Sequence, residues 1–408
     1  MPIDIRPVSD DEFIDFARVD FAAFGGKVDD RVLDSHRPVF EADRSLAAFE
    51  GDRLVGTAGS FSFEVTLPGL ASVPAAAVSY VGVLPTHRRR GVLSALMRCQ
   101  LDDVRRRGEP LAVLTASEAG IYGRFGYGPA TYTAEYELRR REARLGDDAR
   151  AEGVELVEGG AVPGLVAGAY ESYRRAQVGE VSRTEGWWRT SVEAIQPWAD
   201  QDGSRFFVVH RRGGEVDGYA SYRFRDEWTD SMPDAQLTVS DLWATNPQAE
   251  AALVSYLLSI DLVAKVKLEG RPVEDPLRWR LVDGRQLRTR RVADHLWCRP
   301  VDAAAALAAR RYRAEGELCL EIRDELCPWN EGHLVVEGGP DGASCRYEKS
   351  CPADLALGPA ELGSVLLGGV RPSSLARAGR LAELRPGALA RADLMLGSDP
   401  APWCGTEF

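Results

Sequence analysis

The sequence predicts an α/β (α+β) protein of two or three domains. Strand-like apolar runs alternate with helical patterns, first between residues 45 and 116 and again between residues 206 and 260. The chain has 408 residues, which is too long for one ordinary hydrophobic core. Its composition, 45% hydrophobic and 27% charged, is typical of a globular protein.

The charge balance and the residue usage exclude several classes of function. The net charge of −12 argues against nucleic acid or an anionic membrane as a partner and is compatible with a cationic substrate. We expect no signal peptide, no membrane helix and a cytoplasmic location, because no apolar stretch is long enough for either segment. The seven cysteines are scattered and the five histidines are far apart, so we expect no metal site.

Residues 1–135 are the first predicted α/β domain. An acid-rich start predicts a helix near its N-terminus, and a turn at Gly51-Asp52-Arg53 separates two strands. The predicted elements are a helix at 10–16, strands at 45–50, 54–58, 78–83 and 111–116, and a glycine-rich loop at 117–129.

The stretch from residue 78 to residue 96 is the most informative part of this domain. A strand ends at Val83, three arginines and Gly91 follow, and an apolar pattern of helical period then runs towards Gly108, a predicted C-cap. The first amides of a helix lack internal partners and attract phosphate, and glycine allows close approach to the backbone. The alternative is a solvated basic turn between an ordinary strand and helix.

Two motifs resemble a known family. Arg88-x-x-Gly91-x-Leu93 resembles motif A of the GNAT superfamily of N-acetyltransferases, although Leu93 replaces the usual small residue. The pairing of Val-Gly-Val-Leu-Pro-Thr-His-Arg-Arg-Arg-Gly, from Val81, with Ser-Glu-Ala-Gly-Ile-Tyr-Gly-Arg-Phe-Gly-Tyr, from Ser117, resembles the Eis family of actinobacteria.

The resemblance implies acetyl-CoA as the co-substrate and Tyr122 as the general acid. A backbone amide near Tyr80 to Val81 would stabilise the oxyanion. The alternative for Tyr122 is an aromatic ring that packs the loop against the core. The residues implied in acetyl-CoA binding are Val81, Gly82, Val83, Arg88, Arg89, Arg90, Gly91, Val92, Leu93, Ser94, Ser117 and Glu118.

Residues 151–295 repeat the α/β pattern after a charged, polar connector predicted at 136–150. Its strand-to-helix junction, residues 243–250, has no arginine or glycine and carries Glu250 where a phosphate would lie, so we predict a second GNAT fold without a cofactor site. Trp187 and Trp188 are expected in a core or interface, with an amine site as the alternative. The predicted elements are strands at 206–209, 216–222 and 237–243, and a helix at 249–260.

Residues 300–408 resemble the sterol-carrier-like C-terminal domain of Eis proteins. Strands are predicted at 318–322 and 333–337, and helices at 354–367 and 373–378. The last residues, Trp403-Cys404-Gly405-Thr406-Glu407-Phe408, resemble the end of that family's chains, which implies that the terminal carboxylate of Phe408 is the general base. The alternative is a disordered tail, but its apolar residues favour a buried one.

The implied activity is direct transfer of an acetyl group from acetyl-CoA to a primary amine of a cationic acceptor, such as an aminoglycoside, a polyamine or a lysine. Candidate residues for cation binding are Glu407, Asp241 and Asp30. The resemblance also implies a homo-oligomer, a hexamer built as a trimer of dimers. The alternatives are a regulatory or scaffold protein that binds acetyl-CoA without turnover and a lipid carrier that depends on the third domain.

Overall fold

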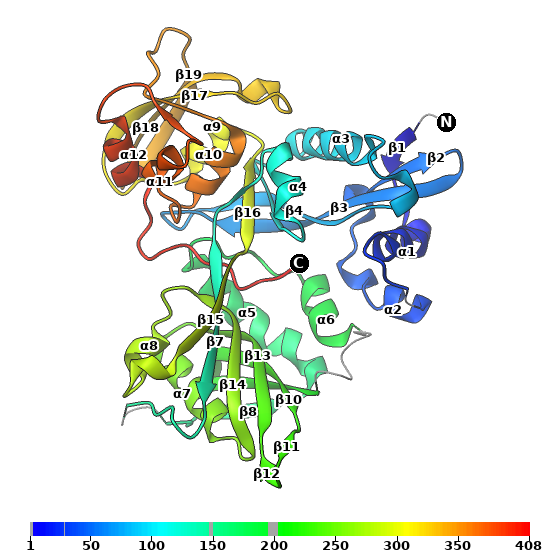
Figure 1. Cartoon of the computed structure of the whole chain (residues 1–408), viewed down its shortest axis with the longest axis vertical. Helices are drawn as coiled ribbons and strands as arrows, with labels where there is room; N and C mark the ends of the chain where they lie inside the picture. Colours follow the sequence, from blue (N-terminus) through cyan, green and yellow to red (C-terminus); the bar gives the residue numbers. More distant parts are fainter. Residues whose placement is uncertain (1–2, 28, 147–149, 195–202) are drawn as a thin grey trace. The chain divides into compact units, whose positions relative to one another are not determined.

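The structure is a computed structural model that describes residues 3–27, 29–146, 150–194 and 203–408 (Figure 1). Contacts divide the chain into two compact units. The first unit comprises Met1–Thr131, Gln177–Ser182 and Asp294–Phe408, and the second comprises Tyr132–Ala176 and Arg183–Ala293. The domain bounds 1–135, 151–295 and 300–408 stay predictions.

The first unit contains a seven-stranded sheet in the order β1-β2-β3-β4-β5-β16-β6. Neighbouring strands are antiparallel except β4 and β5, which are parallel. The strands are β1 (Ile3–Pro7), β2 (Leu46–Glu50), β3 (Arg53–Thr66), β4 (Ser72–Val83), β5 (Leu111–Thr115), β6 (Gly128–Pro129) and β16 (Leu296–Pro300).

Strands β4 and β5 pair only over a short stretch and then diverge. Ala75–Ala77 pair with Leu111–Val113, whereas the rest of β4 continues to Val83 beside β3 alone. A β-bulge interrupts the β3–β4 register, because Thr57 pairs with Gly82 but Gly59 pairs with Ser79. Tyr80 and Val81 therefore lie opposite one residue, and Tyr80 has a positive φ of 52°.

Helices cover both faces of this sheet. Ala47 and Phe49 pack with Phe16 of α1 (Phe13–Ala23), whereas Ala48 packs with Leu96 of α3 (Val92–Arg106). Successive residues of a strand point to opposite faces, so α1 and α3 lie on opposite sides. The first unit also contains two shorter helices, α2 (Asp30–Asp34) and α4 (Ala119–Tyr122).

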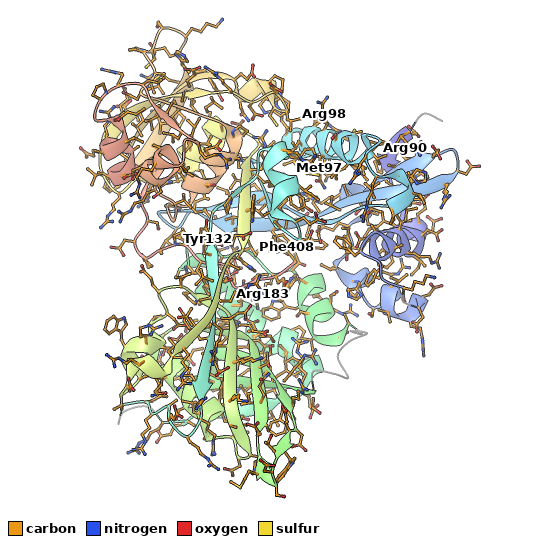
Figure 2. The ribbon with its side chains drawn as sticks, viewed as in Figure 1. Arg90, Met97, Arg98, Tyr132, Arg183 and Phe408 are labelled. Carbon is orange, nitrogen blue, oxygen red and sulfur yellow. The ribbon has the colours of Figure 1, made fainter. Side chains whose placement is uncertain are left out.

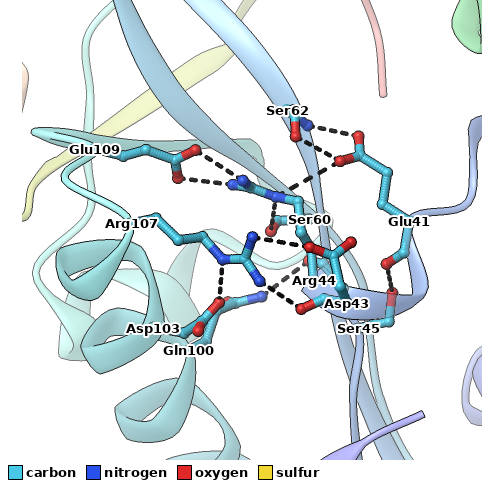
Figure 3. A network of polar contacts seen from close by, with 11 residues as sticks. Glu41, Asp43, Arg44, Ser45, Ser60, Ser62, Gln100, Asp103, Arg107 and Glu109 are labelled. Atoms are coloured by element: carbon cyan, nitrogen blue, oxygen red, sulfur yellow. Dashed lines mark hydrogen bonds and ion pairs between the residues drawn. The ribbon is translucent and has the colours of Figure 1, made fainter. Parts of the chain in front are cut away.

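Helix α3 is held at its C-terminal end by a Schellman motif and a polar network. Gly108 has a φ of 73° and its amide donates to the Arg105 carbonyl, which confirms the predicted C-cap. Arg44 forms a buried ion pair with Glu109 at 2.8 and 2.7 Å, and Gln100 donates to the Gly59 carbonyl (Figure 3). These contacts fix α3 against β3, and hence the position of its N-terminus.

The C-terminal part of the first unit adds a five-stranded sheet, β19-β18-β17-β20-β21. The predicted helix at 354–367 is partly wrong. Leu355 and Leu357 pair in parallel with β17 as strand β20, and the helix begins only at Pro359. The elements are α9 (Ala303–Ala309), β17 (Gly316–Ile322), β18 (Gly332–Gly339), β19 (Gly342–Tyr347), β20 (Leu355–Leu357), α10 (Pro359–Leu366), α11 (Pro372–Arg377), β21 (Ala382–Glu383) and α12 (Ala388–Leu396).

The second unit is built on another seven-stranded sheet, β15-β7-β14-β13-β10-β9-β8. Here β13 and β14 are parallel, and α7 connects them. The elements are β7 (Tyr132–Arg139), β8 (Val154–Val157), α5 (Val162–Arg175), α6 (Glu185–Glu193), β9 (Ser204–Arg212), β10 (Glu215–Arg225), β11 (Trp228–Thr229), β12 (Met232–Pro233), β13 (Ala235–Ala244), α7 (Pro247–Ser259), β14 (Val263–Pro272), α8 (Leu277–Arg280) and β15 (Arg288–Asp294).

Part of the predicted connector at 136–150 is strand, which corrects that prediction. Residues up to Arg139 belong to β7, where Ala134, Tyr136 and Leu138 are buried in the core of the second unit. Their alternation is that of a half-buried strand, which the flanking charges obscured. Residues 147–149 of the connector lie outside the described residues.

In the described part of the chain, no helix combines the length and the apolarity that crossing a bilayer requires.

Candidate functional site

A cavity of about 710 Å³ lies in the first unit where β4 runs past β5. Its walls come from the end of β4, the arginine-rich turn, the start of α3, the loop after β5 and the end of α1. Eleven of the twelve predicted acetyl-CoA residues line it: Val81, Gly82, Val83, Arg88, Arg89, Gly91, Val92, Leu93, Ser94, Ser117 and Glu118. Tyr122 lines the same cavity.

The turn before α3 has the backbone shape of an anion site. Arg89 and Gly91 have positive φ values of 61° and 82°. The first helical bond runs from the Ala95 amide to the Gly91 carbonyl, so the amides of Val92, Leu93 and Ser94 precede it. These amides and the helix dipole favour a phosphate at this wall of the cavity.

The three arginines of the turn have different surroundings. Arg88 donates to the carbonyl of Ala23 at 2.6 Å and of Val83 at 3.3 Å, which ties the end of α1 to β4. Arg90, the predicted residue that does not line the cavity, donates to Glu50 at 2.6 Å and holds the pKa of that carboxyl down to about 2. Arg89 is exposed at the cavity and has no carboxylate partner among the residues described.

Tyr122 combines burial with access to the cavity. Its ring packs edge-on against Tyr127, with 6.2 Å between centroids, and joins a cluster with residues of β4, β5 and α3. Burial raises the pKa of the phenol, and the Ser117 side chain acts in the opposite direction. The hydroxyl is therefore protonated at neutral pH and able to donate a proton.

Asp20 is a buried carboxyl beside this cavity that sequence reasoning missed. It lies on α1, and its Oδ1 accepts no hydrogen bond from the part of the chain that the structure describes. Burial raises its pKa to about 7, and its charge also raises the pKa of Tyr80 and Tyr122. Nothing in the local sequence marks it, because acidic residues on an amphipathic helix are usually solvated.

Residues 402–406 of the C-terminal tail are buried or half-buried, and the tail reaches the end of β5. A carboxylate oxygen of Phe408, which is labelled in Figure 2, accepts a hydrogen bond from Thr115 Oγ1 at 3.1 Å. The Phe408 ring packs edge-on against Phe63, with 5.4 Å between the ring centroids. Thr115 ends β5, two residues before the cavity residue Ser117. The structure therefore brings the chain terminus and the Tyr122 loop to the same strand end.

Two of the candidate cation-binding carboxylates already have arginine partners. Asp30 pairs with Arg18 at 2.8 Å. Asp241 pairs with Arg183 at 2.6 Å, and the Arg183 guanidinium lies 4.4 and 4.9 Å from the ring centres of Trp187 and Trp188. The faces of Trp187 and Trp188 in the second unit are thus in contact with the cationic side chain of Arg183. The third candidate, Glu407, is exposed on the tail.

The corresponding junction of the second unit is closed by an ion-pair network. Glu250 pairs with the buried Arg271 at 2.6 Å, and Arg271 also pairs with Asp275 at 2.7 Å. A carboxylate at the start of α7 repels phosphate, and the absence of a cofactor site in the second GNAT fold stays a prediction. No group of three or more potential metal ligands occurs among the described residues.

Three segments match known domain families. Residues 4–130 and 179–300 each match an acetyltransferase (GNAT) domain, and residues 303–405 match a sterol carrier protein domain. These matches confirm the predicted order of two GNAT folds and a sterol-carrier-like domain.

Known N-acetyltransferases match most of the chain. An uncharacterized N-acetyltransferase of Streptomyces coelicolor is 44% identical over 397 residues, 95% of each chain. N-acetyltransferase Eis of Mycobacterium tuberculosis is 35% identical over 88% of this chain and 87% of its own. The crystal structure of Eis1 from Mycobacterium abscessus superposes with a TM-score of 0.87 at 37% identity, covering 99% of this chain and 100% of that one.

Proposed function

The chain belongs to the Eis family of N-acetyltransferases, and we propose that it transfers the acetyl group of acetyl-CoA directly to a primary amine of a cationic acceptor. The observation that carries this proposal is the convergence of the phosphate-type turn, the diverging strand β4 and Tyr122 on one cavity. The turn directly follows β4 in sequence, whereas Tyr122 lies beyond α3 and β5, so only the packing of the sheet brings it to the same cavity.

The cavity residues divide by the part of acetyl-CoA that each suits. Arg89 and the amides of Val92 to Ser94 suit the pyrophosphate, since they combine positive charge with unpaired donors. The edge of β4 from Val81 to Val83, which β5 does not reach, suits the amide-containing arm of the co-substrate, where backbone groups can pair with it.

The chemistry needs one oxyanion donor and two proton transfers. The amine attacks the thioester carbonyl, and the backbone amide at the Tyr80–Val81 bulge stabilises the oxyanion. Collapse of the intermediate expels the CoA thiolate, which takes the proton of Tyr122. The Phe408 carboxylate attracts the ammonium group and accepts the proton that the attacking nitrogen sheds, directly or through water.

The acceptor is proposed only as a class: an aminoglycoside, a polyamine or a lysine side chain. The net charge of −12 favours the approach of such cations. No disulfide joins any of the seven cysteines, all of which lie among the described residues, and this supports work in the reducing cytoplasm. We also propose a homo-oligomer, a hexamer built as a trimer of dimers, from the family membership.

The experiment combines calorimetry of acetyl-CoA binding with a turnover assay that detects released CoA by a thiol-reactive dye across a panel of amines. Release that depends on an amine would support the proposal. Binding without release from any amine would favour the regulatory alternative. Failure to bind acetyl-CoA at millimolar concentration would rule out both.

A further inference from the structure

We infer that Glu180 is a positioning residue for this reaction: its buried carboxylate holds residues 404–406 and so sets where the Phe408 carboxylate lies. This inference rests on the proposed role of Phe408. Among the described residues, the hydrogen bonds of the Glu180 side chain run to Val181 and to the tail and not to a predicted cofactor residue, so it would act through the tail.

The segment that carries Glu180 is fixed to the first sheet. Residues 177–182 belong to the first unit although they lie between two parts of the second. The Gly179 amide donates to the Thr66 carbonyl at 2.8 Å, and the Thr66 amide donates to the Glu180 carbonyl at 3.0 Å. Val181 forms a bridge with Val65 of β3. The backbone at Glu180 is therefore a rigid base for its side chain.

Both oxygens of the Glu180 carboxylate accept hydrogen bonds from the tail. Oε1 accepts from Thr406 Oγ1 at 2.8 Å and from Cys404 Sγ at 3.5 Å, and Oε2 accepts from the Gly405 amide at 2.9 Å. The amide of the next residue, Val181, also donates to Oε1 at 3.1 Å. Three successive tail residues thus bind one carboxylate.

Because both partners of this contact are buried, the Glu180 carboxylate and the tail each depend on the other for hydrogen bonds. Glu180 is 1% exposed and Thr406 is fully buried. Within the described residues, Glu180 forms no ion pair with a basic side chain, so its oxygens depend on neutral hydrogen-bond donors. A buried carboxylate that loses its hydrogen-bond donors is costly. If the tail left this site, the buried carboxylate would lose the hydrogen bonds that the tail donates.

The anchor lies close to the terminus. Two residues separate Thr406 from the carboxylate of Phe408, a span of at most about 7 Å. His295 Nε2 hydrogen-bonds the Thr406 carbonyl at 3.1 Å, and the Trp403 amide donates to the Val178 carbonyl at 2.9 Å. Of these residues, Glu180 is the one whose side chain contacts three tail residues, so its replacement should make the terminus most mobile.

The test uses Glu180→Gln and Thr406→Val, with Thr406→Ser as the matched control that keeps the hydroxyl. In Glu180→Gln and Thr406→Val we expect kcat to fall by about 10-fold or more, since a misplacement of about 1 Å can cost roughly 10²-fold. The dissociation constant of acetyl-CoA should not change. The double variant should lose no more than the worse single one, because both changes break the same contact.

A second readout reports the tail without relying on catalysis. Carboxypeptidase should release Phe408 faster from Glu180→Gln and Thr406→Val than from the parent and Thr406→Ser. Parent-like kcat and release rate in both variants would overturn the inference, and Thr406→Val decides alone if Glu180→Gln does not fold. Full activity with a glycine added after Phe408 would instead refute the proposed role of the carboxylate, and the release rates would still test Glu180.

Discussion

Asp20 and Gly82 lie against each other beside the cavity: a Cβ atom at position 82 would sit 3.2 Å from Asp20 Oδ1. It would also lie 2.8 Å from the Cβ of Ala23. Glycine at position 82 therefore permits the close approach of α1 to β4. This contact buries a carboxyl group behind the strand proposed to hold acetyl-CoA.

The first prediction follows from that burial. The pKa of Asp20 is raised from 3.8 to about 7 in the folded chain, so folding favours the protonated form. The contribution of protonated Asp20 to the free energy of unfolding is fully present below about pH 4 and is lost as the pH rises through 7. The total loss is at most about 4 kcal/mol. Asparagine stays neutral at both pH values. The melting temperature of Asp20→Asn minus that of the parent should therefore be larger at about pH 8 than at about pH 5.

The matched control is Asp15→Asn, which changes an exposed residue on the same helix. Its melting temperature should follow that of the parent at both pH values. The same pH dependence in Asp20→Asn and in the parent would show that Asp20 is ionised in the folded chain.

The second prediction concerns the phosphate turn. Arg89→Glu should weaken acetyl-CoA binding roughly 10- to 100-fold, because it replaces a favourable charge-assisted contact with repulsion. The melting temperature should hardly change, since Arg89 is exposed. Arg98→Glu makes the same charge change on the exposed side of α3 (Figure 2) and should bind normally. Calorimetry and thermal melts check these outcomes, and equal loss of folding would indicate a purely structural turn.

The third prediction separates the Tyr122 hydroxyl from its ring. Tyr122→Phe should lower kcat by roughly 10²- to 10⁴-fold, the usual span for a lost acid–base group, with little change in KM for acetyl-CoA. Tyr127→Phe is the control, because the neighbouring Tyr127 hydroxyl is buried and has no hydrogen-bond partner among the described residues. Steady-state kinetics decide; unchanged kcat in Tyr122→Phe would assign the ring to packing.

The fourth prediction concerns the position of the terminal carboxylate. A glycine appended after Phe408 turns its carboxylate into an amide and moves the charge outward by up to about 3.5 Å. We expect kcat to fall at least about 10²-fold, with folding and acetyl-CoA affinity unchanged. The same glycine added at the N-terminus should have no effect. Full activity of the extended protein would direct the search for the base to Glu118 or Asp241.

The fifth prediction is the assembly. Light scattering at micromolar concentration should give the mass of a hexamer, six times 44.6 kDa. A monomer under those conditions would contradict the proposed oligomer.

The local sequence pattern around the cavity determined most of the candidate site. The apolar run to Val83, the arginines, Gly91 and the helical repeat up to Gly108 are contiguous, so hydrogen bonds within a strand, a turn and a helix decide their structure. Resemblance then connected this stretch with Tyr122. The pattern gave the wrong prediction at Leu355–Leu357, because these residues pair with β17 as a strand and are not helical.

Only the tertiary structure decided which distant side chains meet. It directed Arg90 to Glu50, 40 residues away, and placed Asp20 behind Gly82. It also brought Glu180 to Thr406 across 226 residues. Periodicity carries information about a residue's own helix or strand, whereas these contacts depend on how separate elements pack. For that reason the sequence predicted the cofactor turn, but the buried carboxylates beside the cavity and under the tail emerged only from the fold.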